Sequence, residues 1–153
     1  MKNLLLLLLL FSFNSFAQTF TGKVISIKDG DTVVVLDSLN QSTTLRLAEI
    51  DCPEKKQPFG NRAKQFTSSQ VYQVTIKYVV TDIDRYGRAI AMIYYGEDNK
   101  YLSAELVRNG MAWHYKKYSK SKELADLEIK ARENKIGLWS GPNPVNPSEW
   151  RRN

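Results

Sequence analysis

The chain has 153 residues, with 22 lysines and arginines against 16 acidic residues, and only one cysteine and one histidine. A single cysteine excludes an intrachain disulfide, and a single histidine, His114, excludes both a two-histidine ribonuclease site and a metal site built from several histidines. The positive net charge favours polyanions as partners.

The first 17 residues have the pattern of a secretory signal peptide. Lys2 is followed by the seven leucines Leu4 to Leu10, and Ser15 to Ala17 fits a cleavage site. The apolar run is shorter than the roughly 20 residues that span a bilayer. We predict cleavage after Ala17, which gives a secreted or periplasmic chain without a membrane anchor; an uncleaved anchor is the alternative.

The mature chain is predicted to form one α+β, mainly β domain over residues 18–140. Alternation with a period of two predicts five strands, and a period of 3.6 predicts three helices. The strands are expected at 20–28, 32–36, 44–48, 71–81 and 86–95, and the helices at 61–70, 101–109 and 122–134. This order favours a small barrel over a parallel sheet.

The last segment, residues 141–153, is proline-rich and is predicted to be an extended tail. Its Trp150, Arg151 and Arg152 either dock back on the domain or trail away from it. We assign this tail no function.

Charged residues lie at the ends of the second and third predicted strands. If these strands form a hairpin, Asp31 at the start of one lies near Asp51 just beyond the other. Carboxylates and backbone carbonyls are ligands of hard cations such as calcium. The thiol of Cys52 is a poor calcium ligand, so its carbonyl is the better candidate. Taken alone, Asp31 is equally well explained as a turn residue that bonds its own backbone.

Two further segments combine cations and aromatic rings. The turn at residues 84–88 contains Arg85 and Arg88. The planar guanidinium of an arginine can bind the oxygens of a phosphate, but taken alone both residues are better explained as solvated charges on a loop. Residues 111–119 interleave lysines with rings, which suits single-stranded bases that stack at about 1–3 kcal/mol each. Packing of Trp113 and Tyr115 between helices is the alternative, and we expect His114 to be structural.

Three motifs in this order resemble those of the staphylococcal (micrococcal) nuclease family. They are Asp-Gly-Asp-Thr at 29–32, Arg-Leu-x-x-Ile-Asp-x-Pro-Glu at 46–54 and Asp-Arg-Tyr-Gly-Arg at 84–88, and the resemblance covers about residues 24–139. It implies a five-stranded OB-type barrel with three helices. It also implies calcium-dependent hydrolysis of DNA and RNA with 3′-phosphate products. We expect single-stranded substrates to be preferred and the protein to be a monomer.

The resemblance also implies a role for each matching residue. Asp31, Asp51 and the backbone carbonyl of Cys52 would hold calcium, Glu54 would position or deprotonate the attacking water, Arg46 and Arg88 would bind the phosphate, and Tyr86 and Tyr118 would lie at the nucleotide. Two departures are Cys52, where the best-known members have threonine, and a link after Glu54 that lacks their long basic loop. Because the expected ligand at Cys52 is a main-chain oxygen, we expect the metal site to persist.

The rival function is a secreted, non-catalytic OB-type module that binds single-stranded nucleic acid. Such a module would share the fold, but Asp31, Asp51 and Glu54 would repel a phosphate backbone unless a cation intervened. A polysaccharide hydrolase with paired carboxylates would leave the arginines without a role. A Ser-His-Asp hydrolase lacks the Gly-x-Ser-x-Gly pattern.

Overall fold

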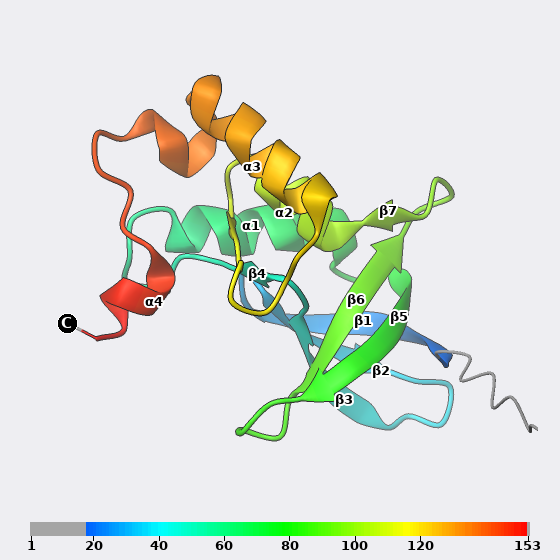
Figure 1. Ribbon diagram of the computed structural model, residues 1–153. Coiled ribbons are helices and arrows are strands. Elements are labelled where there is room, and N and C mark those ends of the chain that lie inside the picture. Colours follow the sequence, from blue (N-terminus) through cyan, green and yellow to red (C-terminus); the bar gives the residue numbers. More distant parts are fainter. Residues whose placement is uncertain (1–17, 153) are drawn as a thin grey trace, which may run out of the picture.

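Five strands close into a barrel in the computed structural model, which describes residues 18–152 (Figure 1). The barrel strands are β1 (Thr19–Asp29), β2 (Thr32–Leu36), β3 (Ser42–Leu47), β5 (Thr75–Ile83) and β6 (Ala89–Tyr95). Neighbours in the order β3-β2-β1-β5-β6 pair antiparallel, and a parallel pairing of β3 with β6 closes the ring. The prediction of an OB-type, mainly β α+β fold is confirmed. The predicted signal peptide, residues 1–17, lies outside the described residues.

The barrel interior is filled by the inward residues of the alternating strands. Leu45 and Leu47 of β3 are fully buried, which turns Arg46 to the other side of the strand. Burial of one such side chain stabilises the fold by roughly 1.5–3 kcal/mol. The predicted hairpin is present: Thr32 pairs with Arg46, and the amide of Leu47 donates to the carbonyl of Asp31 at 2.8 Å.

The three predicted helices are α1 (Gly60–Val71), α2 (Leu102–Arg108) and α3 (Lys122–Glu133), and they lie together above the barrel in Figure 1. Ser121 caps α3, since its hydroxyl accepts from the amide of Leu124 at 3.2 Å. Two predicted strand limits are wrong. Val71 ends α1 instead of beginning a strand, and Tyr86 lies in the turn before β6.

Several short elements complete the fold: β4 (Ile50–Asp51), β7 (Lys100–Tyr101), β8 (Trp113–His114), the 3₁₀ turn η1 (Gly137–Ser140) and α4 (Pro147–Trp150). β4 pairs antiparallel with β8, which fixes Asp51 opposite Trp113. Among residues 18–152, no helix has the length and apolar character needed to span a bilayer.

The tail is not extended throughout, contrary to the prediction. Asn146 caps α4 by accepting from the amide of Ser148 at 2.9 Å, and Pro147 occupies the first turn, where its missing N–H costs no hydrogen bond. The tail folds back so that α4 lies on the side of β4 and α1 (Figure 1). Of the two sequence-based alternatives, docking is therefore correct.

Candidate active site

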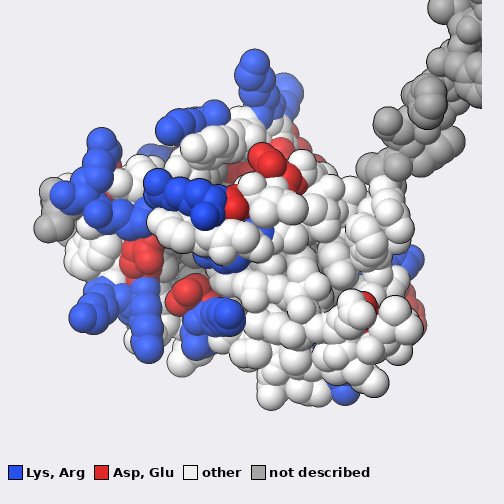
Figure 2. Space-filling view, turned by 90° about the horizontal axis from the view of Figure 1, so that it is seen from below, with Lys and Arg blue, Asp and Glu red and all other residues white. Residues whose placement is uncertain are grey.

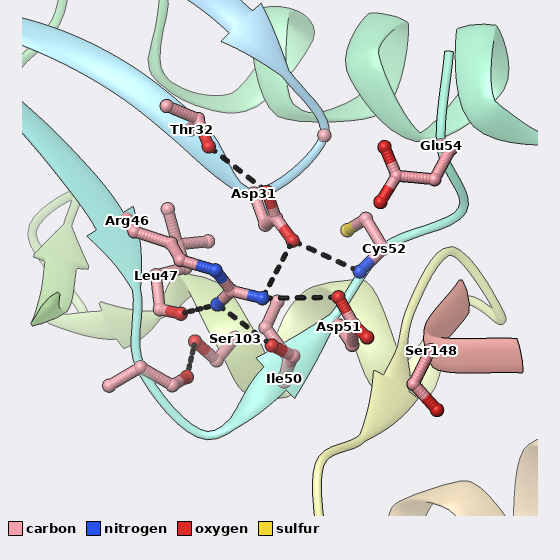
Figure 3. Close-up of polar contacts among 12 residues, drawn as sticks. Asp31, Thr32, Arg46, Leu47, Ile50, Asp51, Cys52, Glu54, Ser103 and Ser148 are labelled. Carbon is pink, nitrogen blue, oxygen red and sulfur yellow. Dashed lines mark hydrogen bonds and ion pairs between the residues drawn. The ribbon is translucent and has the colours of Figure 1, made fainter. Parts of the chain in front are cut away.

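A partly buried arginine, Arg46, joins the two buried carboxylates of Asp31 and Asp51 (Figure 3). Nη2 of Arg46 lies 3.2 Å from Oδ2 of Asp31 and 3.1 Å from Oδ1 of Asp51. Its Nη1 donates to the carbonyls of Leu47 at 2.7 Å and Ile50 at 3.0 Å. The hairpin and β4 thus bring together residues from both acidic motifs, as the sequence predicts.

Burial and neighbouring charges act in opposite directions on the pKa values of this group. Burial lowers the pKa of Arg46, but Asp31 and Asp51 outweigh it, so the pKa of Arg46 is raised and the guanidinium stays charged. Burial raises the pKa of Asp51, an effect that its hydrogen bond to Arg151 opposes. The net pKa of Asp51 is raised, because burial of this 2% exposed residue outweighs the favourable charges of Arg151 and Arg46 beside it.

Cys52 contributes its main chain to the site and its thiol to the core. Its amide donates to Oδ2 of Asp31 at 3.1 Å. Burial raises the pKa of the Cys52 thiol well above its usual value, so this sulfur is not an anionic ligand. The sulfur packs over Gly30, where an added Cβ would lie 3.0 Å from it and 2.8 Å from the Cβ of Ala63. Gly30 is therefore required by close packing.

The oxygen donors of this group fit calcium better than a softer metal. One nitrogen of Arg46 touches both Asp31 and Asp51, so the two carboxylates are close enough to face one cation. Within the described part of the chain, no three His, Cys, Asp or Glu side chains converge as a metal site. Calcium accepts such a set because backbone carbonyls and water supply its remaining ligands.

Glu54 and Arg88 lie on the more exposed rim of the site. The Glu54 side chain is 40% exposed, on the loop that leads from β4 to α1. Nε of Arg88 donates to Oδ2 of Asp84 at 2.7 Å, and its Nη1 donates to the hydroxyl of Thr32 at 3.4 Å. Thr32 in turn donates to Oδ1 of Asp31, so Arg88 reaches the edge of the buried group.

The predicted aromatic contacts of the nucleotide are both open to solvent. Tyr86 is 71% and Tyr118 is 69% exposed. The guanidinium of Arg88 lies 5.5 Å from the centre of the Tyr86 ring, which links this ring to the rim. Tyr118 packs edge-on against Tyr115, with 4.9 Å between ring centres.

Two other residues of the basic aromatic segment, Trp113 and His114, are structural. Trp113 packs against Trp139 with ring centres 4.4 Å apart, so for Trp113 the packing alternative is correct. His114 is buried and hydrogen-bonds the hydroxyl of Ser119 at 2.9 Å, in agreement with the expected structural role.

Arg151, on the tail, is a site residue that the sequence analysis missed. Its Nη2 lies 2.7 Å from Oδ2 of Asp51, and its Nη1 lies 2.6 Å from Oε1 of Glu54. The hydrogen bond to Asp51 is the main reason that the pKa of Arg151 is raised. The pair Asn146-Pro147 signals a helix start shortly before the arginine, but it does not indicate where that helix docks.

Basic side chains surround the acidic ones on one side of the molecule. Figure 2 shows lysines and arginines gathered around a few acidic groups on the half of that face toward the C-terminal end, while the other half is mostly uncharged.

Comparison with known proteins identifies the family. The family model described as staphylococcal nuclease homologue matches residues 44–141. The chain belongs to this staphylococcal nuclease family. The matched residues include Arg46, Asp51, Glu54 and Arg88, whereas Asp31 and Arg151 lie outside them.

Relatives in the staphylococcal nuclease family are similar over most of the chain. A protein of Haemophilus influenzae named uncharacterized endonuclease is 43% identical over 132 residues, which cover 86% of this chain and 73% of that protein. A micrococcal nuclease of Shigella flexneri is 38% identical over 142 residues, 87% of this chain and 81% of that protein. An uncharacterized endonuclease of Escherichia coli is 37% identical over 150 residues, 98% of this chain and 97% of that protein.

Proposed function

We propose that this protein is a calcium-dependent endonuclease that hydrolyses phosphodiester bonds of DNA and RNA and leaves 3′-phosphate ends. The observation that carries the proposal is the convergence of Asp31, Asp51 and Glu54 with Arg46 and Arg88 at one end of the barrel. Membership of the nuclease family and the names of the relatives support the reaction class.

Asp31, Asp51 and the carbonyl of Cys52 are the residues that would hold calcium. When bound there, calcium supplies positive charge that offsets the charge of the phosphate and makes a water molecule more acidic. The two carboxylates are held in place by hydrogen bonds, since the amide of Cys52 fixes Asp31 and Arg46 contacts both. These contacts hold the two carboxylates in fixed positions beside each other.

Glu54 is the candidate that orients the attacking water and accepts its proton. Its Oε1 accepts from Arg151, whereas its Oε2 has no protein donor among the described residues. The second oxygen is therefore free to receive a hydrogen bond from water.

Arg46 and Arg88 have different tasks in this proposal. Nη1 and Nη2 of Arg46 already contact four protein oxygens, so Arg46 mainly provides positive charge beside the carboxylates. Arg88 uses Nε and Nη1 for Asp84 and Thr32, which leaves Nη2 to bind a phosphoryl oxygen. A donor that faces charge developing in the transition state contributes roughly 2.7–4 kcal/mol.

Single-stranded substrates are favoured by the exposed rings of Tyr86 and Tyr118. Bases that are not held in a duplex can stack on such rings, and stacking tolerates any base. We propose these two tyrosines as the base contacts of the bound strand.

The test is cleavage of single-stranded DNA by the purified protein with calcium or with a chelator, together with Glu54→Ala. Calcium-dependent cleavage by the wild type that Glu54→Ala loses is the expected result. Glu133→Ala is the matched control, because Glu133 is an exposed glutamate near the end of α3. Mass spectrometry of the fragments identifies the phosphate end.

Stable binding of the DNA without cleavage under every condition would contradict the proposal. It would instead favour the non-catalytic nucleic-acid-binding module that shares this fold.

A further inference from the structure

The C-terminal tail supplies an arginine to the acidic site. We propose that Arg151 is a positioning residue of the nuclease reaction, which holds the carboxylate of Glu54 in the orientation needed to act on the attacking water. The inference rests on the proposed function, because it assigns Glu54 that task.

Glu54 depends on Arg151 for its orientation. Its side chain is 40% exposed and projects from a loop, where free rotation would scatter the carboxylate over many positions. Among residues 18–152, Arg151 is the one protein group that hydrogen-bonds this carboxylate, at 2.6 Å. Without Arg151, the structure offers Glu54 no other anchor within its described part.

Arg151 is itself held by a bidentate ion pair with Asp51. Nη2 of Arg151 donates to Oδ2 of Asp51 at 2.7 Å, and Nη1 donates to Oδ1 at 3.2 Å. The same Nη1 bridges to Oε1 of Glu54, so one planar guanidinium fixes Glu54 relative to Asp51. Since Asp51 is only 2% exposed and joined to Arg46, the reference point is rigid.

The tail is anchored to the same loop that carries Glu54. The side chain of Gln57 accepts from the amide of Glu54 at 3.0 Å and donates to the carbonyl of Val145 at 2.6 Å. Pro147 at the start of α4 is buried. In Figure 3, α4 with Ser148 lies at the side of the site occupied by Asp51 and Glu54. The loop and the tail therefore move as one unit, which keeps Arg151 within reach of Glu54.

The neighbouring arginine provides a matched control. Arg152 is exposed, and its Nε donates to the carbonyl of Ser148 at 3.2 Å, within the tail itself. Arg152→Gln removes the same charge one position away without touching either carboxylate of the site.

The experiment measures kcat and KM on single-stranded DNA at saturating calcium for the wild type, Arg151→Gln, Arg151→Lys and Arg152→Gln. Because small displacements of a reacting group cost up to about 100-fold in rate, Arg151→Gln is expected to lower kcat about 10- to 100-fold with KM changed less than about twofold. Arg151→Lys is expected to recover part of the loss, and Arg152→Gln to match the wild type.

A double-mutant cycle with Glu54→Gln shows whether Arg151 acts through Glu54. Adding Arg151→Gln to Glu54→Gln is expected to cost no further activity, because the carboxylate to be positioned is already gone. Multiplicative losses would overturn the proposal, as would an unchanged kcat in Arg151→Gln. A raised kcat would also overturn it and would mean that the tail blocks the site.

Urea unfolding of the wild type, Arg151→Gln, Glu54→Gln and the double variant tests the same contact without measuring activity. The effects of the two substitutions on the folding equilibrium are expected to be coupled, since their side chains touch. If the wild type fails to cleave DNA, the proposed nuclease function fails. Uncoupled unfolding effects alongside an active wild type would instead reject the Arg151 contact alone. If Arg151→Gln does not fold, Arg151→Lys takes its place in both cycles.

Discussion

The candidate site has an inner half and a rim that differ in how they are built. The inner half, Asp31, Arg46 and Asp51, lies on or beside barrel strands, with side chains no more than 14% exposed. The rim, formed by Glu54, Arg88 and Tyr86, lies on loops and is exposed by 29% or more.

The difference predicts two kinds of response to substitution. Inner residues neutralise one another away from water, so removing one leaves an unpaired buried charge. Rim residues lose little when a partner is removed, because water replaces it. Substitutions in the inner half should therefore lower both stability and activity strongly, and those in the rim should lower activity much more than stability.

The largest effect is expected for Arg46→Ala in the inner half. It leaves the buried Asp31 without its ion pair and Asp51 with Arg151 alone, which should cost about 3–5 kcal/mol of unfolding free energy. The rate should also fall about 100- to 1,000-fold. Urea denaturation and DNA cleavage measure the two effects. Unchanged stability of the variant would show that Arg46 does not stabilise the two buried carboxylates.

Arg88→Ala in the rim should lower the rate as much but leave the fold intact. Its ion pair with Asp84 is partly exposed, so the loss in unfolding free energy should be about 0–1 kcal/mol. The same two assays apply. Near-normal turnover would remove Arg88 from the proposed phosphate contacts, and a large loss of stability would erase the distinction between rim and inner half.

Tyr118→Ala should weaken binding of single-stranded DNA with little effect on kcat. Loss of one stacking ring corresponds to about 1–3 kcal/mol of binding free energy. Fluorescence anisotropy with a labelled oligonucleotide measures the affinity. Tyr72→Ala is a control, because Tyr72 is also exposed but follows α1 at a different place in the fold. Equal effects of the two substitutions would contradict the assignment.

A smaller effect of pH is expected from His114, outside both halves. Burial lowers the pKa of His114, and its Nδ1 has no partner within the described residues. The folded state therefore binds fewer protons than the unfolded state. Stability should be complete above about pH 6.5 and fall by at most about 1.4 kcal/mol per unit as the pH drops toward the folded pKa.

His114→Gln should remove this pH dependence of stability. Urea denaturation from pH 7 down to the folded pKa of His114 measures it. If the variant and the wild type lose stability in parallel, another group is responsible.

The inner half was predictable from sequence because local rules determine it. Strand alternation turns Arg46 away from Leu45 and Leu47, and the hairpin brings Asp31 toward Asp51. Arg151 was not predictable in this way. Its partners Asp51 and Glu54 lie about a hundred positions earlier in the chain, and no periodicity or turn rule relates such distant segments.

Ambiguous local signals explain the smaller errors. Val71 is β-branched and begins an alternating run, yet it completes α1, and the chain turns at Gln73 with a φ of 62° before β5 begins. Side-chain pattern alone does not show where one element ends when both neighbours are apolar.

Because the thiol of Cys52 is packed over Gly30, its chemical labelling can measure local opening of the folded protein. A buried thiol with a raised pKa reacts slowly with alkylating reagents, so its labelling requires the segment around it to separate from α1. Because Cys52 directly follows Asp51 and is the chain's one cysteine, the labelling rate would report how often the end of the barrel that carries the candidate site opens, without any introduced probe.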